Sequence, residues 1–384
     1  ARRRVCRGWH SSKGGAVIVQ NARTQKFAGV RQTGARMAAW TDAYKRWEAF
    51  ADSDDDEATI NDDLVVTPHA PRETPATAAD VFLRGPILDA VQRSRVYDDG
   101  KAFVDMPLKV APGQALSAFR SVYVGDKDEL RRFIEAHFGA AGSDLMRAPL
   151  PKDYQQKFPQ RVDADHVELM AAIHAMWPKL LRVSRDDFPE RRTLIARRFP
   201  FVVPGGRFRE GYYWDSYWIV KGLLRSGMRE TALGIVRNFL DDVRAFGYVP
   251  NGNRTYYQGR SQPPLLAEMV SLLDDDALTA EAAPLIEIEL SWWSGRRASA
   301  IKGLARYGSD MSEPRPESYL EDVETAARAF TPNPEKDLRS ILKERTEAGA
   351  SIYSEIRAAA ESGWDFSSRW LRGDGLETTR TRDI

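Results

Sequence analysis

The chain has 384 residues, a formal net charge of +1 and a single cysteine, Cys6. A net charge this close to zero gives no electrostatic reason to expect a nucleic acid partner. No apolar run approaches the roughly 18 residues that a membrane-spanning helix needs, so we expect no membrane partner. One cysteine excludes an intramolecular disulfide, and the five histidines show no zinc-ligand spacing, so we expect no metal and no cofactor.

The first 73 residues differ from the rest of the chain in charge. Residues 1–50 hold eleven Lys or Arg against only Asp42 and Glu48, and an acidic cluster and a proline-containing stretch follow. This pattern predicts a basic extension and a linker, both disordered, over residues 1–73. A helical domain is then expected over residues 74–384.

From about residue 80 the apolar residues recur at steps of three and four, which is typical of amphipathic helices. The spacing predicts one helix from Val167 to near Arg185 with a kink at Pro178, and a helix pair broken at Ser226-Gly227. Further helices are expected around residues 81–91, 130–138, 265–273, 286–293, 319–330 and 341–360. Strand-like alternation is weak, so the fold class is all-α, either an open solenoid or a closed toroid.

The segment at residues 204–217 carries five aromatic rings and both charge signs directly before a helix. Carboxylate and guanidinium groups bind hydroxyls through charge-assisted hydrogen bonds, and aromatic faces cover the C–H faces of a pyranose. The alternative is an ordinary Pro-Gly-Gly turn followed by core aromatics. The composition favours a sugar-binding loop.

Three later loops combine Arg, carboxylate or amide groups with Gly or Pro, at residues 250–264, 315–319 and 361–370. Each alone has a structural explanation as a turn, a surface ion pair or a helix cap. Asp365 stands out because it lies between Trp364 and Phe366, and apolar surroundings would raise the pKa of its carboxyl and keep a proton available.

All four loops, and Phe103-Val104-Asp105 near the start, resemble the motifs of trehalases in the family's order, from about Thr74 to Asp383. The resemblance implies an (α/α)6 toroid of the six-hairpin glycosidase type and inverting hydrolysis of α,α-trehalose to two glucose molecules. It implies Asp365 as the general acid. It also implies sugar contacts from Arg207, Trp214, Asp215, Asn251, Arg260, Ser261, Gln262, Arg315, Glu317 and Gly363.

The sequence departs from the family after Asp383. The second family signature and the glutamate that acts as general base do not occur in this chain, so we expect a toroid that is incomplete at its C-terminus. Two alternatives follow: an α,α-trehalase or its acid-bearing part, and an inactive fragment that binds a disaccharide or acts as a helical interaction module. The resemblance implies trehalose as the partner and a monomer if the protein is complete. It leaves periplasm and cytoplasm open and favours the periplasm.

Overall fold

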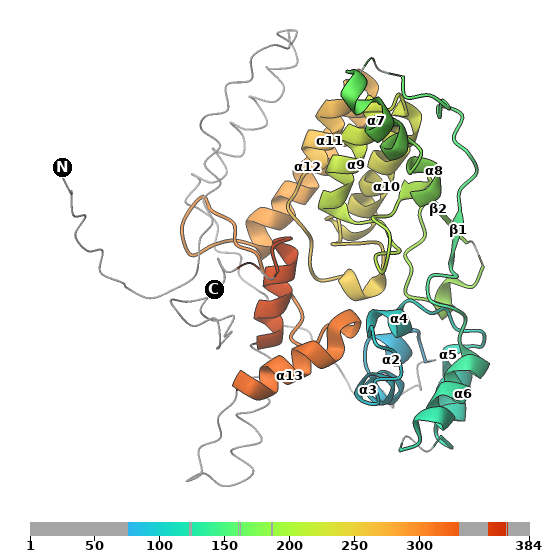
Figure 1. Ribbon diagram of the computed structural model, residues 1–384. Helices are drawn as coiled ribbons and strands as arrows, with labels where there is room; N and C mark the ends of the chain where they lie inside the picture. The colour runs from blue at the N-terminus through green and yellow to red at the C-terminus, as the bar shows by residue number, and fades with distance from the viewer. Residues whose placement is uncertain are drawn as a thin grey trace, which may run out of the picture.

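The computed structural model describes residues 76–122, 125–159, 161, 163–185, 187–329, 352–365 and 367. The extension and linker predicted for residues 1–73 lie outside these described residues, as does most of the helix predicted from residue 341. Within the described part the chain forms two groups of helices, with a small sheet beside them (Figure 1).

The first group is built around aromatic side chains. It comprises α2 (Ala79–Phe82), α3 (Pro86–Arg93), α4 (Lys101–Val104), α5 (Pro112–Phe119) and α6 (Lys127–His137). Phe82, Phe103 and Phe138 are buried, and the centroids of their rings lie 5.3 to 5.8 Å apart, a spacing typical of aromatic packing. The short helices α2 and α4 are thus held by this core.

A three-stranded antiparallel sheet follows, in the order β1 (Leu145–Arg147), β2 (Leu181–Ser184) and β3 (Phe201–Val202). The sequence predicts one helix from residue 167 to near 185, which is wrong for residues 181–184. The 3₁₀ turn η1 (Ala164–His166), α7 (Val167–His174) and α8 (Trp177–Leu180) precede the strand. Residues 181–184 instead pair with β1 and β3, so tertiary pairing overrides the helical spacing.

The second group consists of four longer helices: α9 (Tyr213–Arg225), α10 (Arg229–Phe246), α11 (Leu266–Leu273) and α12 (Asp276–Arg296). Gly227, with φ of 73°, turns the chain between α9 and α10, as the Ser226-Gly227 break predicted. The loops within the pairs α9/α10 and α11/α12 are short, so each pair is an αα-hairpin, the unit from which a helical toroid is built.

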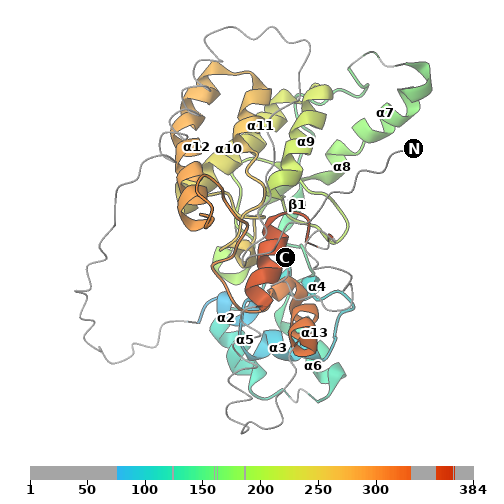
Figure 2. The same cartoon turned by 90° about the vertical axis from the view of Figure 1, so that its left-hand side faces the viewer.

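The C-terminal part of the described chain returns from the second group to the first, where it lies beside α3 and α4. It contains η4 (Pro316–Ser318), α13 (Tyr319–Ala329) and a helix at residues 352–361, drawn in red (Figures 1 and 2). Two more 3₁₀ turns, η2 (Pro189–Arg191) and η3 (Thr255–Tyr257), lie in the connecting loops. The described residues are mainly helical, which confirms the all-α class.

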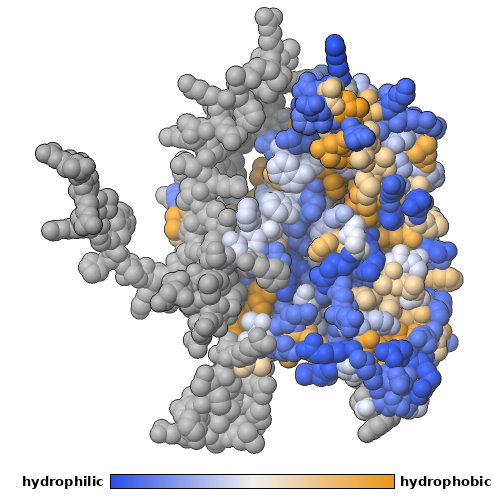
Figure 3. Space-filling model, in the orientation of Figure 1, coloured by the Kyte–Doolittle hydropathy of each residue, from blue (hydrophilic) through white to orange (hydrophobic). Residues whose placement is uncertain are grey.

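Several large apolar side chains on the described surface are exposed. Trp218 on α9 is 60% exposed, and Val167, Leu169 and Ile173 on α7 are also exposed. Figure 3 shows apolar atoms gathered over the upper helices among polar ones.

Candidate active site

The segment at residues 204–217 turns sharply and then enters α9. Gly205 and Gly206 have φ of 101° and 62°, and the backbone N–H groups of Gly205 and Phe208 bond to each other's carbonyl oxygens. The helix begins at Tyr213, so Trp214 and Asp215 lie in its first turn. The local sequence thus places an indole and a carboxyl at a helix N-terminus.

Glu210 anchors this segment to the rest of the molecule. Its buried carboxylate accepts hydrogen bonds from Lys101 Nζ at 2.8 Å, Arg254 Nε at 3.3 Å and Tyr257 Oη at 3.1 Å, and from the hydroxyl of Tyr212. A buried charge with several donors holds its surroundings in one geometry, since each lost donor leaves an uncompensated group. The segment of aromatic and charged residues that follows Glu210 is therefore held in place at its N-terminal end.

The second loop, at residues 250–264, is hydrogen-bonded directly to the start of α9. Tyr213 N donates to Asn251 O at 3.1 Å, and Trp214 N donates to the side-chain oxygen of Gln262 at 3.0 Å. Asn251 Nδ2 donates across the loop to Ser261 O at 3.3 Å. These bonds bring four of the predicted sugar-binding residues together: Trp214, Asn251, Ser261 and Gln262.

Arg260 and Glu317 form a buried ion pair in which Nη2 lies 2.5 Å from Oε1. Nε and Nη1 of Arg260 and Oε2 of Glu317 have no hydrogen-bond partner among the described residues. Burial alone would raise the pKa of Glu317, but the positive charges of Arg260, Arg315 and Arg357 outweigh it and lower the pKa. The pair thus offers two donors and one ionised acceptor oxygen to a ligand.

Arg315 is held by a carboxylate that the sequence analysis did not single out. Its Nε and Nη2 donate to Asp322, as does its backbone N–H at 2.8 Å. Burial alone would lower the pKa of Arg315, but Asp322 and, more weakly, Glu317 and Asp365 raise it. Asp365 is therefore within electrostatic reach of the guanidinium.

The fourth loop leaves the helix at residues 352–361 through Gly363, whose φ is 71°. A Cβ at Gly363 would lie 2.7 Å from the Trp214 ring, so the two residues are in close contact. The rings of Trp214 and Trp364 lie 6.3 Å apart between centroids. Asp365 follows and is exposed, which differs from the apolar surroundings expected for its carboxyl.

Two predicted contacts stand apart from the rest. Arg207 is half-exposed and forms a two-pronged pair with Asp99 at 2.6 and 2.8 Å. Within the described residues, none of its hydrogen bonds or ion pairs reaches another predicted sugar-binding side chain. Asp215 is partly buried and forms no ion pair with a described residue, and burial raises the pKa of its carboxyl.

Sequence reasoning missed the buried charges that support these loops. They are Glu210 in its supporting role, Arg297, Asp322, Arg357 and Glu361, and all are less than a tenth exposed. Charged residues are common on surfaces, so their spacing alone gave no sign of burial. Arg357 donates to the carbonyl oxygens of Glu313 and Pro314, and burial followed by repulsion from Arg260 lowers its pKa to about 10.

No cluster of metal-binding side chains occurs among the residues that the structure describes. No helix in the described ranges is long and apolar enough to cross a membrane.

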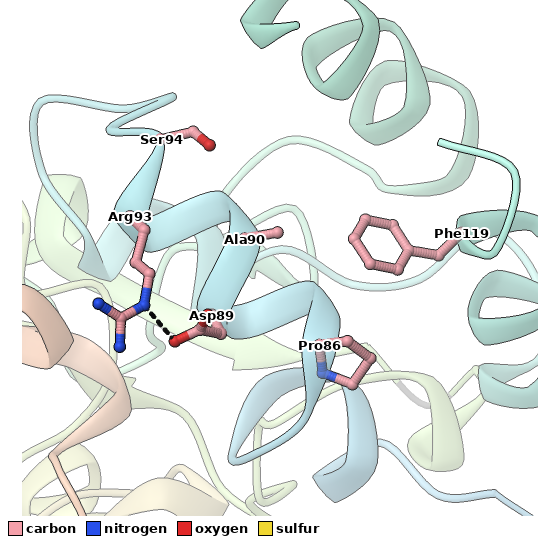
Figure 4. A pocket seen from close by; sticks show the side chains of 6 residues that line it. All are labelled: Pro86, Asp89, Ala90, Arg93, Ser94 and Phe119. Atoms are coloured by element: carbon pink, nitrogen blue, oxygen red, sulfur yellow. Dashed lines mark hydrogen bonds and ion pairs between the residues drawn. The ribbon is translucent and has the colours of Figure 1, made fainter. Parts of the chain in front are cut away.

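A surface hollow of about 440 Å³ lies along α3, lined by Pro86, Asp89, Ala90, Arg93, Ser94 and Phe119 (Figure 4). The carboxylate of Asp89 is already paired with Arg93 and accepts a hydrogen bond from the Tyr319 hydroxyl, so we assign no ligand site to this hollow.

The described loops place guanidinium, carboxylate and indole groups of four separate segments within one region of a helical protein, an arrangement typical of carbohydrate-binding sites. Residues 95–384 match the family described as Trehalase. The chain belongs to the trehalase family.

Individual relatives agree with this assignment. A trehalase from Oryctolagus cuniculus is 38% identical over 335 residues, which cover 81% of this chain and 55% of the relative. A periplasmic trehalase from Xanthomonas campestris is 35% identical over 336 residues, covering 82% of this chain and 53% of the relative. The chain thus spans about half the length of the curated relatives it matches. A solved structure of the neutral trehalase Nth1 from Saccharomyces cerevisiae is 26% identical in sequence. The match covers 44% of this chain and 34% of the yeast chain with a TM-score of 0.36, and we draw no conclusion from it.

Proposed function

We propose that this chain carries the acid-bearing part of an α,α-trehalase site and that the protein hydrolyses trehalose to two glucose molecules with inversion. The observation that carries the proposal is the buried Arg260–Glu317 pair, whose remaining donors and acceptor have no partner among the described residues. Buried polar atoms are nearly always satisfied, so unsatisfied ones in the loop that bonds to Trp214 through Gln262 indicate a polar ligand. A sugar hydroxyl meets both requirements, since it donates and accepts.

Asp365 is proposed as the general acid that protonates the glycosidic oxygen. It lies at the end of a tight turn that packs on Trp214, and its charge acts on Arg315. An exposed carboxyl is accessible to the leaving oxygen of a bound disaccharide. The proposed contacts from Trp214, Gln262, Asn251, Ser261, Arg260, Glu317, Arg315 and Gly363 come from the loops around it, with Arg207 and Asp215 as further contacts.

Inverting hydrolysis also needs a carboxylate that activates water on the other face of the sugar, roughly 6.5–9.5 Å from the acid. Glu317 is held by Arg260 and its pKa is lowered, which makes it a weak base. Burial raises the pKa of Asp215, which would suit a base, but Asp215 is one of the proposed sugar contacts. This supports a second candidate function, in which the 384-residue chain binds a disaccharide without cleaving it.

The test measures glucose release from trehalose by the 384-residue chain, together with calorimetric titration of trehalose. Turnover that Asp365→Asn removes, with binding retained, supports the hydrolase; binding without turnover supports the second candidate. A chain that folds, as judged by circular dichroism, but neither binds nor cleaves trehalose contradicts both.

A further inference from the structure

The last residue of the helix at 352–361, Glu361, is fully buried although its side chain is a carboxylate. It accepts hydrogen bonds from the backbone N–H groups of Ser261 at 2.7 Å and Gly308 at 2.6 Å. It also accepts from Nε and Nη2 of Arg297 at 2.8 and 3.0 Å. Four donors occupy the acceptor capacity of a carboxylate, so Glu361 is not available to a ligand.

Arg297, directly after α12, is equally buried and connects three segments. Besides Glu361, it donates through Nη2 to Gly259 O and through Nη1 to Asp310, both at 3.0 Å. Gly259 immediately precedes Arg260. The pair therefore binds the sugar-binding loop at residues 259–262 from two sides, through the carbonyl of Gly259 and the N–H of Ser261.

Only three residues separate Glu361 from Asp365, and their path is fixed by hydrogen bonds. Gly363 N donates to Ala360 O at 3.2 Å, and Trp364 N donates to the Ser362 hydroxyl at 3.0 Å. Gly363 lies against Trp214, which leaves the turn no room to shift toward α9. The position of Asp365 thus depends on where Glu361 is held.

We propose that the Arg297–Glu361 pair is a positioning device that fixes the Asp365 turn relative to the sugar-binding loop at residues 259–262. Burying two charges is expensive, and well-packed apolar residues are often as stable, so stability alone does not account for the pair. Its bonds instead join the turn that carries Asp365 to the loop that carries Arg260 and Gln262. The proposal rests on the proposed hydrolase function, and both residues act through Asp365 and the loop.

The test is Glu361→Gln in the 384-residue chain, assayed on two substrates. Trehalose requires a proton on its leaving glucose, whereas the fluoride of α-glucosyl fluoride leaves with little help from an acid. A displaced acid lowers kcat for trehalose on the order of 100-fold, as for misplacements of about 1 Å. KM for trehalose and turnover of α-glucosyl fluoride are expected to change little.

Asp310→Asn is the matched control, since Asp310 contacts the same guanidinium but not the Asp365 turn. It should leave the ratio of the two activities as in the parent chain. If Glu361→Gln does not fold, as judged by thermal unfolding, Arg297→Lys keeps the charge and removes the forked contact, and the same comparison is made. An equal loss on both substrates overturns the positioning role while the hydrolase stands. A parent chain inactive on both substrates overturns the proposed hydrolase function, and the inference with it.

Discussion

Single residues in the candidate site are constrained by backbone geometry as much as by side-chain chemistry. Gly363 shows this most clearly, because its φ of 71° disfavours any side chain and a Cβ would lie 2.7 Å from the Trp214 indole. The sequence showed Gly363 only as part of a loop motif. That the glycine is required by contact with Trp214, some 150 residues earlier in the chain, depends on tertiary packing.

Gly363→Ala should both destabilise the fold and weaken trehalose binding, because the new methyl group displaces Trp214. Gly247→Ala is the control, since Gly247 has φ of 80° with nothing within 4 Å of the added Cβ. The control should lose only roughly 1–2 kcal/mol in the free energy of unfolding, which is the cost of placing alanine in the left-handed conformation. Denaturant unfolding and calorimetric titration measure the two effects; equal binding by both variants would contradict the contact.

At the scale of elements, α12 carries a buried carboxyl inside the helical bundle. Glu289 accepts a hydrogen bond from the Tyr213 hydroxyl at 2.7 Å, next to Trp214, and that hydroxyl also accepts from Leu266 N at 2.9 Å. Burial raises the pKa of Glu289 from its usual 4.5 to about 7. The carboxyl thus links α12 to the first turn of α9 and to α11.

This pKa predicts a pH dependence of stability. The folded chain binds the Glu289 proton more tightly than the unfolded chain, so the contribution is largest below pH 4.5 and declines as pH rises to about 7. The slope approaches about 1.4 kcal/mol per pH unit within this window. Glu289→Gln should flatten it, whereas Glu287→Gln, on the exposed face of the same helix, should keep it. Denaturant unfolding between pH 4 and 8 checks this, and parallel curves for parent and Glu289→Gln would refute it.

Helical spacing predicted most elements but not the sheet. The break at Ser226-Gly227 is local and appears where expected, since glycine readily adopts the positive φ of this turn. The apolar residues of Leu181–Ser184 fit a helical spacing, so the sequence predicts a helix where the structure has a strand. Its partners are supplied by segments more than fifteen residues away, which no local pattern contains.

At the scale of the whole molecule, buried charges join the two groups of helices. Lys101 on α4 contacts Asp105 at 2.6 Å and Glu210 at 2.8 Å, and Arg254 contacts Asp144 at 2.9 Å and Glu210 at 3.3 Å. The loop motifs of the site could be predicted from the sequence, because their residue types are characteristic. This network could not, because a buried charge has no local signature.

Lys101→Met removes one of the two buried cations that Asp105 and Glu210 share, the other being Arg254. The buried cluster is then left with uncompensated negative charge, so we expect a loss of about 3–5 kcal/mol in the free energy of unfolding. Arg93→Met removes an exposed helical pair with Asp89 and should cost less than about 1 kcal/mol. Thermal and denaturant unfolding compare them. Similar losses in the two variants would mean that the network does not join the groups.

The contact between Trp214 and the Gly363 turn has an optical consequence. The indoles of Trp214 and Trp364 lie 6.3 Å apart at an interplanar angle of 52°. Two such chromophores, close and not parallel, couple their electronic transitions and give a circular dichroism couplet that depends on their mutual orientation. Trp292 and Trp293, whose rings lie 5.4 Å apart, couple in the same way. Because one ring of the first pair belongs to α9 and the other to the turn carrying Asp365, the part of the signal that this pair contributes depends on the alignment of the two halves of the site.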